Sequence, residues 1–482
     1  METDRLVQEL SQAIEADSRA GREQDAAAGK GHLGNILLGQ SRLDEAERLY
    51  RESLEIHERL GHQEGIASQN ANLGLVSHLR GDLTQAEQRY KQSLEIETRL
   101  GRTAAMAGDY ANLGNLYLAR RDADAACTMF ERAAACYEKL GNTREWARML
   151  ADLGAACHAK GDLAAARNCF ERAVSLDEAA GDPAALAAHL NSLAALLMFK
   201  GDAAAAEKHF ERVLAIYREQ NSDLGAAQAE MNLASLRLAR QDMDGAVELL
   251  ARALRRFEQA GDQERIADAS ARLALVHLAK GELDVAEGLL RSALAIDEQL
   301  GRDENVASHC LLLAQVAVGR QDAVEAEGLC ERALGVYEAG KNEAGAASAL
   351  GQLGVVHMAR GRLEKAERTL KSAIEIRTRL GQEPQAANDY CNLGNAYVMR
   401  REWDAAERAY QAGLDIAHRH NLTHTLANLH GSLGGLSEQR GNPQGAREHW
   451  EKSLDFARRA GMAHREAQVK QWLDDLKKPP AL

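Results

Sequence analysis

The side chains best suited to chemistry in this sequence are carboxamides that recur at fixed places. Two stretches, DYANLGNLYLARRDADAA and, 280 residues later, DYCNLGNAYVMRREWDAA, share twelve of eighteen letters. They place Asn112 and Asn115 in the first stretch and Asn392 and Asn395 in the second. An asparagine side chain is both a donor and an acceptor, so it can bind the backbone of an extended peptide. This chemistry is recognition by hydrogen bonding.

Residue patterns typical of catalysis do not accompany these asparagines. The sequence contains no phosphate-binding glycine loop, no nucleophile elbow and no HExxH motif. A segment near the C-terminus gathers His418, His420, His424 and His430. These histidines straddle a loop without i,i+4 spacing inside one helix, which favours surface and packing roles over a metal site. The sequence therefore predicts a protein that is not an enzyme, with no cofactor and no metal.

The elements that position the asparagines follow from a repeat of forty residues. Steps of forty from Leu33 meet leucine eleven times, and steps from Ala27 and from Ala46 meet alanine eleven times each. No gap is needed from one end of the chain to the other. Such a fixed period is the signature of a repeat architecture.

Each unit of forty residues is predicted to form two helices. In the second unit, apolar residues follow helical spacing over 64–80 and again over 83–100, with a Gly81-Asp82 turn between them. No segment alternates with a period of two, and the chain has only five prolines. The sequence therefore predicts an all-α protein.

One position of the forty-residue repeat marks the C-terminal end of the second helix in each unit. The positions 21, 61, 101 and onward to 461 hold nine glycines and two asparagines, which favour the left-handed conformation of a helix C-cap. The exception is Lys341, and the sequence suggests that the neighbouring Gly340 takes over this role.

Composition limits the classes of partner and compartment. The formal net charge of -13 argues against a nucleic-acid partner. The chain has no apolar run long enough for membrane insertion, and its first residues lack a signal-peptide core. Seven cysteines without a CxxC pair are typical of reduced thiols. These features predict a cytoplasmic protein.

The unit resembles the tetratricopeptide repeat. In the second quoted stretch and the helix after it, the resemblance is carried by Tyr390, Asn392, Leu393, Gly394, Asn395, Tyr397, Ala406 and Tyr410. The unit has forty residues instead of the usual thirty-four, and the proline that closes the second helix is missing. This long form is most similar to the repeats of LGN/Pins adaptors, with kinesin light chains, bacterial Rap regulators and MalT-type activators as looser relatives. The Gly34 and Ala46 columns favour this family over HEAT repeats.

The resemblance implies a right-handed superhelical α-solenoid of tandem helix-turn-helix units. We expect a partial unit or cap over residues 1–21, eleven units over 22–461, and a capping helix with a short tail over 462–482. The first helix of each unit, called helix A below, would line a concave groove, and the second helix, helix B, would lie outside it.

The resemblance also implies which residues of helix A face the groove. They lie five and one residues before the repeated leucine and two residues after it. Arg148 occupies a position where LGN-like grooves hold an Arg/Asn clamp for acidic peptides. The candidate peptide-binding residues are Asn35, Asn72, Asn112, Asn115, Arg148, Asp152, Asn232, Arg272, Asn392 and Asn395.

The sequence leaves three hypotheses for function. The leading one is an adaptor that binds a protein or peptide segment in the groove. The second is a regulatory module of a bacterial signalling system that senses a peptide or effector. The third is a solenoid without a dedicated ligand, in which NLGN is only the default sequence of the family and the middle units have drifted. A column of Lys or Arg at the ends of ten helices A fits either the helix dipole or an acidic partner.

Overall fold

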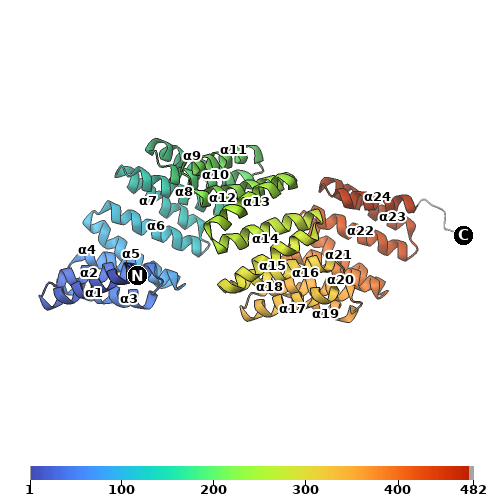
Figure 1. Ribbon diagram of the computed structural model, residues 1–482, viewed down its shortest axis with the longest axis horizontal. Helices are drawn as coiled ribbons and strands as arrows, with labels where there is room; N and C mark the ends of the chain where they lie inside the picture. The colour runs from blue at the N-terminus through green and yellow to red at the C-terminus, as the bar shows by residue number, and fades with distance from the viewer. Residues whose placement is uncertain (1, 477–482) are drawn as a thin grey trace. The chain divides into compact units, whose positions relative to one another are not determined.

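The structure is a computed structural model that describes residues 2–476. These residues form 24 α-helices and no strand, as Figure 1 shows. The predicted all-α fold of tandem helix pairs is confirmed. Residue 1 and residues 477–482, the end of the predicted tail, lie outside the described residues.

Helices begin twenty residues apart from residue 23 to residue 463. The helices A of the eleven units are α2 (Glu23–Gly39), α4 (Gln63–Leu79), α6 (Thr103–Ala119), α8 (Thr143–Lys160), α10 (Pro183–Phe199), α12 (Asp223–Ala239), α14 (Gln263–Lys280), α16 (Asp303–Gly319), α18 (Glu343–Ala359), α20 (Glu383–Met399) and α22 (Thr423–Gln439). The helices B are α3 (Leu43–Leu60), α5 (Leu83–Leu100), α7 (Ala123–Lys139), α9 (Leu163–Ala180), α11 (Ala203–Glu219), α13 (Met243–Ala260), α15 (Leu283–Leu300), α17 (Ala323–Ala339), α19 (Leu363–Arg379), α21 (Trp403–Arg419) and α23 (Pro443–Arg459). They are flanked by α1 (Glu2–Arg19) and α24 (Ala463–Asp475).

The chain divides into two compact parts, residues 1–236 and residues 237–482, with the boundary inside α12. Helices that follow one another along the chain pack against each other from α1 to α11 and from α13 to α24. None of the described helices combines the length and the apolar character needed to cross a membrane.

Each helix from α1 to α23 is followed by a residue with left-handed backbone geometry. All positions spaced by twenty from 21 to 461 have a positive φ, and eight of them are not glycine. Lys341 is one of these, with φ 55°, whereas Gly340 is right-handed with φ −77°. The expectation that Gly340 would replace the cap was therefore wrong. The amide of Asn342 donates to the Tyr337 carbonyl at 2.8 Å, and this bond requires the left-handed turn at residue 341.

The three unbroken columns of the repeat form the core. All eleven alanines in the Ala27 column and all eleven in the Ala46 column are fully buried, and no leucine of the Leu33 column is more than 7 % exposed. Alanine is required because helices that approach closely leave no room for a larger side chain. The repeated letters therefore mark the helix interfaces.

A close contact between helices A and B recurs in most units. Gly114 in α6 faces the ring of Phe130 in α7, and a Cβ atom at Gly114 would lie 2.7 Å from that ring. Gly34, Gly74, Gly154, Gly394 and Gly434 face Tyr50, Tyr90, Phe170, Tyr410 and Trp450 in the same way. The glycine column thus exists to admit a large side chain from helix B.

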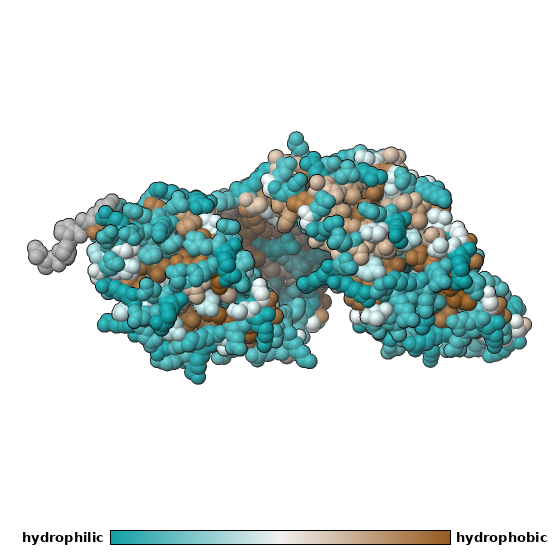
Figure 2. All heavy atoms as spheres, turned by 180° about the vertical axis from the view of Figure 1, so that it is seen from behind, coloured by the Kyte–Doolittle hydropathy of each residue, from teal (hydrophilic) through white to brown (hydrophobic). Residues whose placement is uncertain are grey.

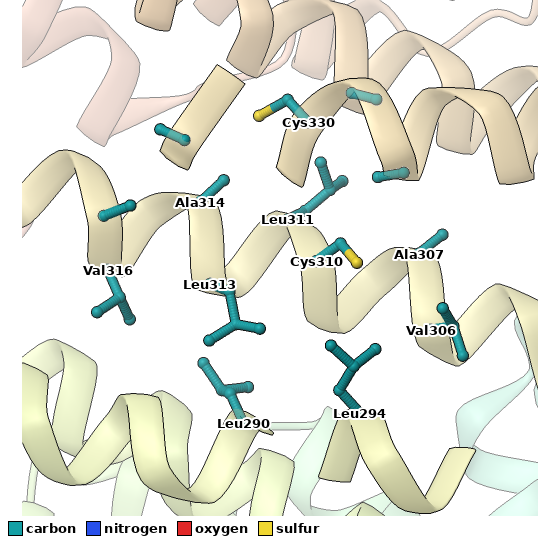
Figure 3. Packing of buried hydrophobic residues seen from close by; sticks show 14 of the residues in the cluster. Leu290, Leu294, Val306, Ala307, Cys310, Leu311, Leu313, Ala314, Val316 and Cys330 are labelled. Atoms are coloured by element: carbon teal, nitrogen blue, oxygen red, sulfur yellow. The ribbon is translucent and has the colours of Figure 1, made fainter. Parts of the chain in front are cut away.

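Cysteines occupy some core positions at which other units have a larger apolar or aromatic residue. Cys330 takes the place of the aromatic residue in α17 and is fully buried. Figure 3 shows α16 between its neighbours, with Leu313 pointing toward Leu290 of α15 and Ala314 on the side of Cys330. All seven cysteines of the chain are free thiols, and six of them are buried.

The last described helix packs against the helix before it. Val469 of α24 is fully buried against Ala446 and Trp450 of α23. Trp472, Leu473 and Leu476 pack against the same cluster from the same side of the helix.

Substitutions at two glycines of α6 test the effect of close packing and the effect of helix propensity separately. We expect Gly114→Ala to lower the free energy of unfolding by about 1–3 kcal/mol, because its methyl group would overlap the Phe130 ring. Gly108→Ala should raise it by about 0.5–1 kcal/mol, because no atom lies within 4 Å of the added carbon and alanine favours helix. Urea unfolding followed by circular dichroism measures both changes. Shifts of the same sign in the two variants would contradict the close contact.

The cap at residue 341 offers a second prediction. Replacing Lys341 by glycine should stabilise the protein by about 1 kcal/mol, since a left-handed lysine is strained and glycine is not. Gly301→Ala, at the equivalent position one unit earlier, should destabilise it by a similar amount. Thermal unfolding of the two variants measures the shifts, and a loss of stability in Lys341→Gly would show that the turn is unstrained.

Candidate functional site

The three predicted groove columns line pockets on the helices A. In the N-terminal part, a pocket of about 400 Å³ lies between α2 and α4 and is lined by residues of all three columns, namely Ala28, His32, Asn35, Ser68 and Asn72. In the C-terminal part, a pocket of about 240 Å³ lies between α16 and α18 and contains Gln315, Gln352 and Val355 of these columns. The columns therefore share one face of the helices A within each part.

Two of the candidate asparagines support the helix pair. The hydroxyl of Tyr50 donates to the Oδ1 atom of Asn35 at 2.8 Å, and that of Tyr410 donates to the Oδ1 atom of Asn395 at 2.7 Å. Both tyrosines are buried against the glycine of helix A. Part of the hydrogen-bonding capacity of Asn35 and Asn395 is thus used inside the unit.

Asn115 differs from these two because of its counterpart in helix B. The residue fifteen positions later is Phe130, which has no hydroxyl to donate. Asn115 is exposed, while Asn112 and Asn392, one position before the repeated leucine, are half-buried. Within the described residues, none of these three carboxamides makes a hydrogen bond to another side chain, in contrast to those of Asn35 and Asn395.

Asn72 and Asn232 each form a hydrogen bond to another carboxamide side chain. The Nδ2 atom of Asn72 donates to Gln69 at 3.3 Å within α4. The Nδ2 atom of Asn232 in α12 donates to Asn191 in α10 at 3.1 Å, which links two neighbouring helices A. These contacts fix the amide orientation along the face.

Arg148 is held by carboxylates of its own helix. Its guanidinium donates to the carboxylate of Glu145 at 2.6 Å and lies 3.6 Å from that of Asp152. Burial raises the pKa of Asp152, and the Arg148 charge opposes that rise. The two predicted site residues thus lie together, but their charges largely neutralise each other and Glu145 adds a second negative charge.

The groove face carries few charges. Among the three columns only Arg148, Asp152, Asp268 and Arg272 are Asp, Glu, Lys or Arg, although these residues make up 27 % of the chain. Asp268 accepts a hydrogen bond from Arg302 at 2.8 Å, and Arg272 is exposed on α14. The other members are mainly Asn, Gln, Ser and small or aliphatic residues. Figure 2 shows one face of the molecule, which is mostly hydrophilic with apolar residues in small groups.

The basic column at the ends of the helices A is engaged within the fold. Lys160 binds Asp124 at 2.7 Å, and Lys280 binds Asp244 at 2.9 Å, in each case on helix B of the preceding unit. Arg80, Arg120, Arg320, Arg360, Arg400 and Arg440 make the same kind of bridge. The sequence did not reveal these ion pairs, although the constant separation of 36 or 33 residues between partners could have done so.

Two histidines lie in contact at the edge of the N-terminal pocket. The backbone amide of Gly65 donates to the Nδ1 atom of His62 at 3.2 Å. His57 Nδ1 lies 3.3 Å from the same atom. Burial lowers the pKa of His57, so the pocket gains no charge from it at neutral pH.

The aspartates that open the two similar stretches have different surroundings. Asp109 in α6 is buried beside Glu97 of α5 and accepts a hydrogen bond from Ser93 at 2.7 Å. Burial, with a further contribution from Glu97, raises the pKa of Asp109 to about 7. Asp389 in α20 instead lies 3.0 Å from the guanidinium of Arg377 in α19. Burial raises the pKa of Asp389 to about 6, and the Arg377 charge opposes that rise.

The predicted histidine group separates into different surroundings. His418 and His430 have ring centroids 6.3 Å apart, while His420 contacts Glu383 at 2.9 Å and His424 is exposed. Burial lowers the pKa of His430 to about 4. Within residues 2–476, no three His, Cys, Asp or Glu residues are arranged to hold a metal ion.

Comparison with known proteins agrees with this architecture. The tetratricopeptide repeat family matches residues 25–99, 102–179, 185–259, 225–299, 303–378 and 345–418. The chain belongs to this family, and the resemblance seen in its sequence is confirmed. A search of curated proteins finds no match.

Solved structures share the fold at low sequence identity. A signal transduction ATPase with numerous domains and a tetratricopeptide repeat sensor, from Pyrococcus horikoshii, is 15 % identical with a TM-score of 0.52, covering 78 % of this chain and 54 % of that one. The apo form of the quorum sensor NprR from B. thuringiensis is 15 % identical with a TM-score of 0.48, covering 75 % and 99 %. BtubC from P. vanneervenii is 20 % identical with a TM-score of 0.41, covering 45 % and 89 %.

The two equivalent aspartates should respond to substitution with opposite signs. Asp109→Asn should stabilise the protein at pH 8 by about 2 kcal/mol, because ionising this buried carboxyl is unfavourable. A folded-state pKa above the unfolded value means that wild-type stability falls as pH rises from about 4 to about 7, so the gain should vanish below pH 4. Asp389→Asn should cost about 3 kcal/mol at neutral pH, since it leaves Arg377 buried without a carboxylate.

Urea unfolding between pH 4 and pH 8 measures both effects. A stabilisation by Asp109→Asn that stays constant over this range would contradict the ionisation argument. Equal effects of the two substitutions would contradict the assignment of different partners.

Proposed function

We propose that this protein is an interaction scaffold whose helices A bind an extended segment of a protein or peptide partner. The observation that carries the proposal is the low-charge face of the helices A, lined by carboxamides and hydroxyls. An extended peptide brings one amide and one carbonyl per residue, and each needs a partner when it leaves water. Asn, Gln and Ser side chains supply such partners without the cost of burying a charge.

In this proposal the helices A recognise the backbone of the partner. They do not bind acidic side chains through a clamp that contains Arg148. Arg148 already lies against Glu145 and Asp152, so an incoming carboxylate would meet two negative charges beside the guanidinium. Eight of the ten basic residues at the ends of the helices A are likewise bridged to acidic residues of the preceding helices B. A regulatory module that senses a peptide would use the same face, and it would differ from a scaffold only in the response that binding triggers.

The most direct test removes three candidate carboxamides that support no buried tyrosine. A variant with Asn112, Asn115 and Asn392 replaced by alanine should lose a partner that the wild-type chain captures from a lysate of its native organism. The residues Asn35 and Asn395 are left in place, because each accepts a hydrogen bond from a buried tyrosine and its loss would disturb packing.

A matched control keeps the comparison specific. Asn168 is exposed on α9, a helix B, and Asn168→Ala should leave capture unchanged. Circular dichroism must show that all variants fold alike. Equal capture by the wild type and the triple variant, or no capture by either, would remove the support for these asparagines as ligand contacts.

A further inference from the structure

The pocket between α16 and α18 is built mainly from aliphatic side chains of the helix A face. Ala314 and Val356 form its floor and are each 1 % exposed. Val318 and Val355 form its walls, with Val318 36 % exposed. Gln315 and Gln352 stand at its rim, and none of the six lining residues is ionisable.

The neighbouring helix B explains why a pocket opens here. In the units with Tyr50 and Tyr410, the phenol reaches the groove column and donates to an asparagine. The equivalent of that asparagine is Gln315, and the equivalent of the tyrosine is Cys330, a much smaller side chain. The Cys330 thiol contacts Gln352 at 3.9 Å, which places it beneath the rim. No aromatic side chain of helix B therefore lines this pocket, whereas the phenol reaches the groove column in the units with Tyr50 and Tyr410.

Charge and size restrict what can enter. The groove columns of α16, α18 and α20 contain no Asp, Glu, Lys, Arg or His residue, so a charged group bound there would lose its water without gaining a counterion. A volume of about 240 Å³ is below the roughly 300–1,000 Å³ of pockets for drug-sized ligands, and it suits a single side chain. Two carboxamides at the rim can bind the backbone on either side of that side chain.

We infer that this pocket anchors a Val, Ile or Leu side chain of an uncharged, extended segment of the partner. The inference rests on the proposed function and specifies it, because it names the chemistry of the segment and the unit that selects it. Binding of such a segment depends on burial of apolar area and on backbone hydrogen bonds. It is therefore insensitive to salt, in contrast to recognition through charged side chains.

A library of random linear peptides displayed on phage provides the probe. Peptides selected on the wild-type chain should share a Val, Ile or Leu at one position and contain few charged residues around it. A synthetic, fluorescently labelled copy of the strongest peptide should bind about 10-fold or more weakly when that residue is replaced by alanine. Its affinity should be the same at low and high salt.

Three variants locate the binding. Val355→Asp introduces a charge at the pocket wall, and Cys330→Phe fills the pocket from the core side without adding a charge. Each should weaken the peptide about 10-fold or more. Phe210 occupies the same column in a unit that has Ala194 opposite, as Ala314 is here, so the chain already contains this pairing. Val324→Asp, at a valine of α17 that is 67 % exposed outside the pocket, should change nothing.

The possible outcomes separate the inference from the proposed function. If selected peptides bind through charged residues, or bind Val355→Asp and Cys330→Phe as tightly as the wild type, the aliphatic anchor is wrong while groove binding stands. If no peptide is enriched on the wild-type chain, the groove does not bind linear segments and both proposals fail. Thermal unfolding identifies a variant that fails to fold, and the remaining variant then decides.

Discussion

The regularity of the chain depends on one contact, the approach of a small residue of helix A to a large side chain of helix B. Where helix A has glycine, helix B usually has a ring, as in Gly114 with Phe130. Where helix A has alanine, as at Ala274 and Ala314, helix B has Leu290 and Cys330. In these two units a larger residue on helix A thus accompanies a smaller one on helix B, and every unit retains the same forty-residue register. The pairing has exceptions, since Ala194 lies opposite Phe210. Gly354 with Leu370 shows that the compensation is approximate.

The same contact shapes the face of the helices A that we propose to bind a partner. The tip of the aromatic side chain reaches past the glycine, where Tyr50 and Tyr410 hold an asparagine of the groove column. A phenylalanine fills the volume without holding that asparagine, and a cysteine leaves the volume open. Variation in a core column therefore changes the hydrogen-bonding and the shape of the binding face, although the core residue itself never touches solvent.

The fold could be predicted from the sequence because its determinants repeat. Leu33, Ala27 and Ala46 each return eleven times, and helices then begin at the expected spacing. The site could be predicted only as a set of columns, since the role of each member depends on a partner in another helix. Asn115 and Asn395 occupy equivalent positions, yet only Asn395 faces a tyrosine hydroxyl. The sequence predicted the wrong residue for the left-handed turn beside Lys341. Glycine is only energetically preferred there, and a stable helix pair can impose the turn on lysine.

Similar sequence in the two quoted stretches therefore does not mean similar chemistry. Tyr117 and Tyr397 each donate to a glutamate of the preceding helix B, Glu87 or Glu367, so this part of both stretches serves packing. Asp109 and Asp389 are the same letter, but one is buried beside a carboxyl group and the other beside a guanidinium. A repeat protein can thus change the properties of one unit through a neighbour while its own sequence stays constant. Because the units share a backbone register, a ligand that follows the helices A would meet these differences in a fixed order. The order of neutral, carboxamide and aliphatic surfaces along the chain, more than any single residue, then defines which segment fits.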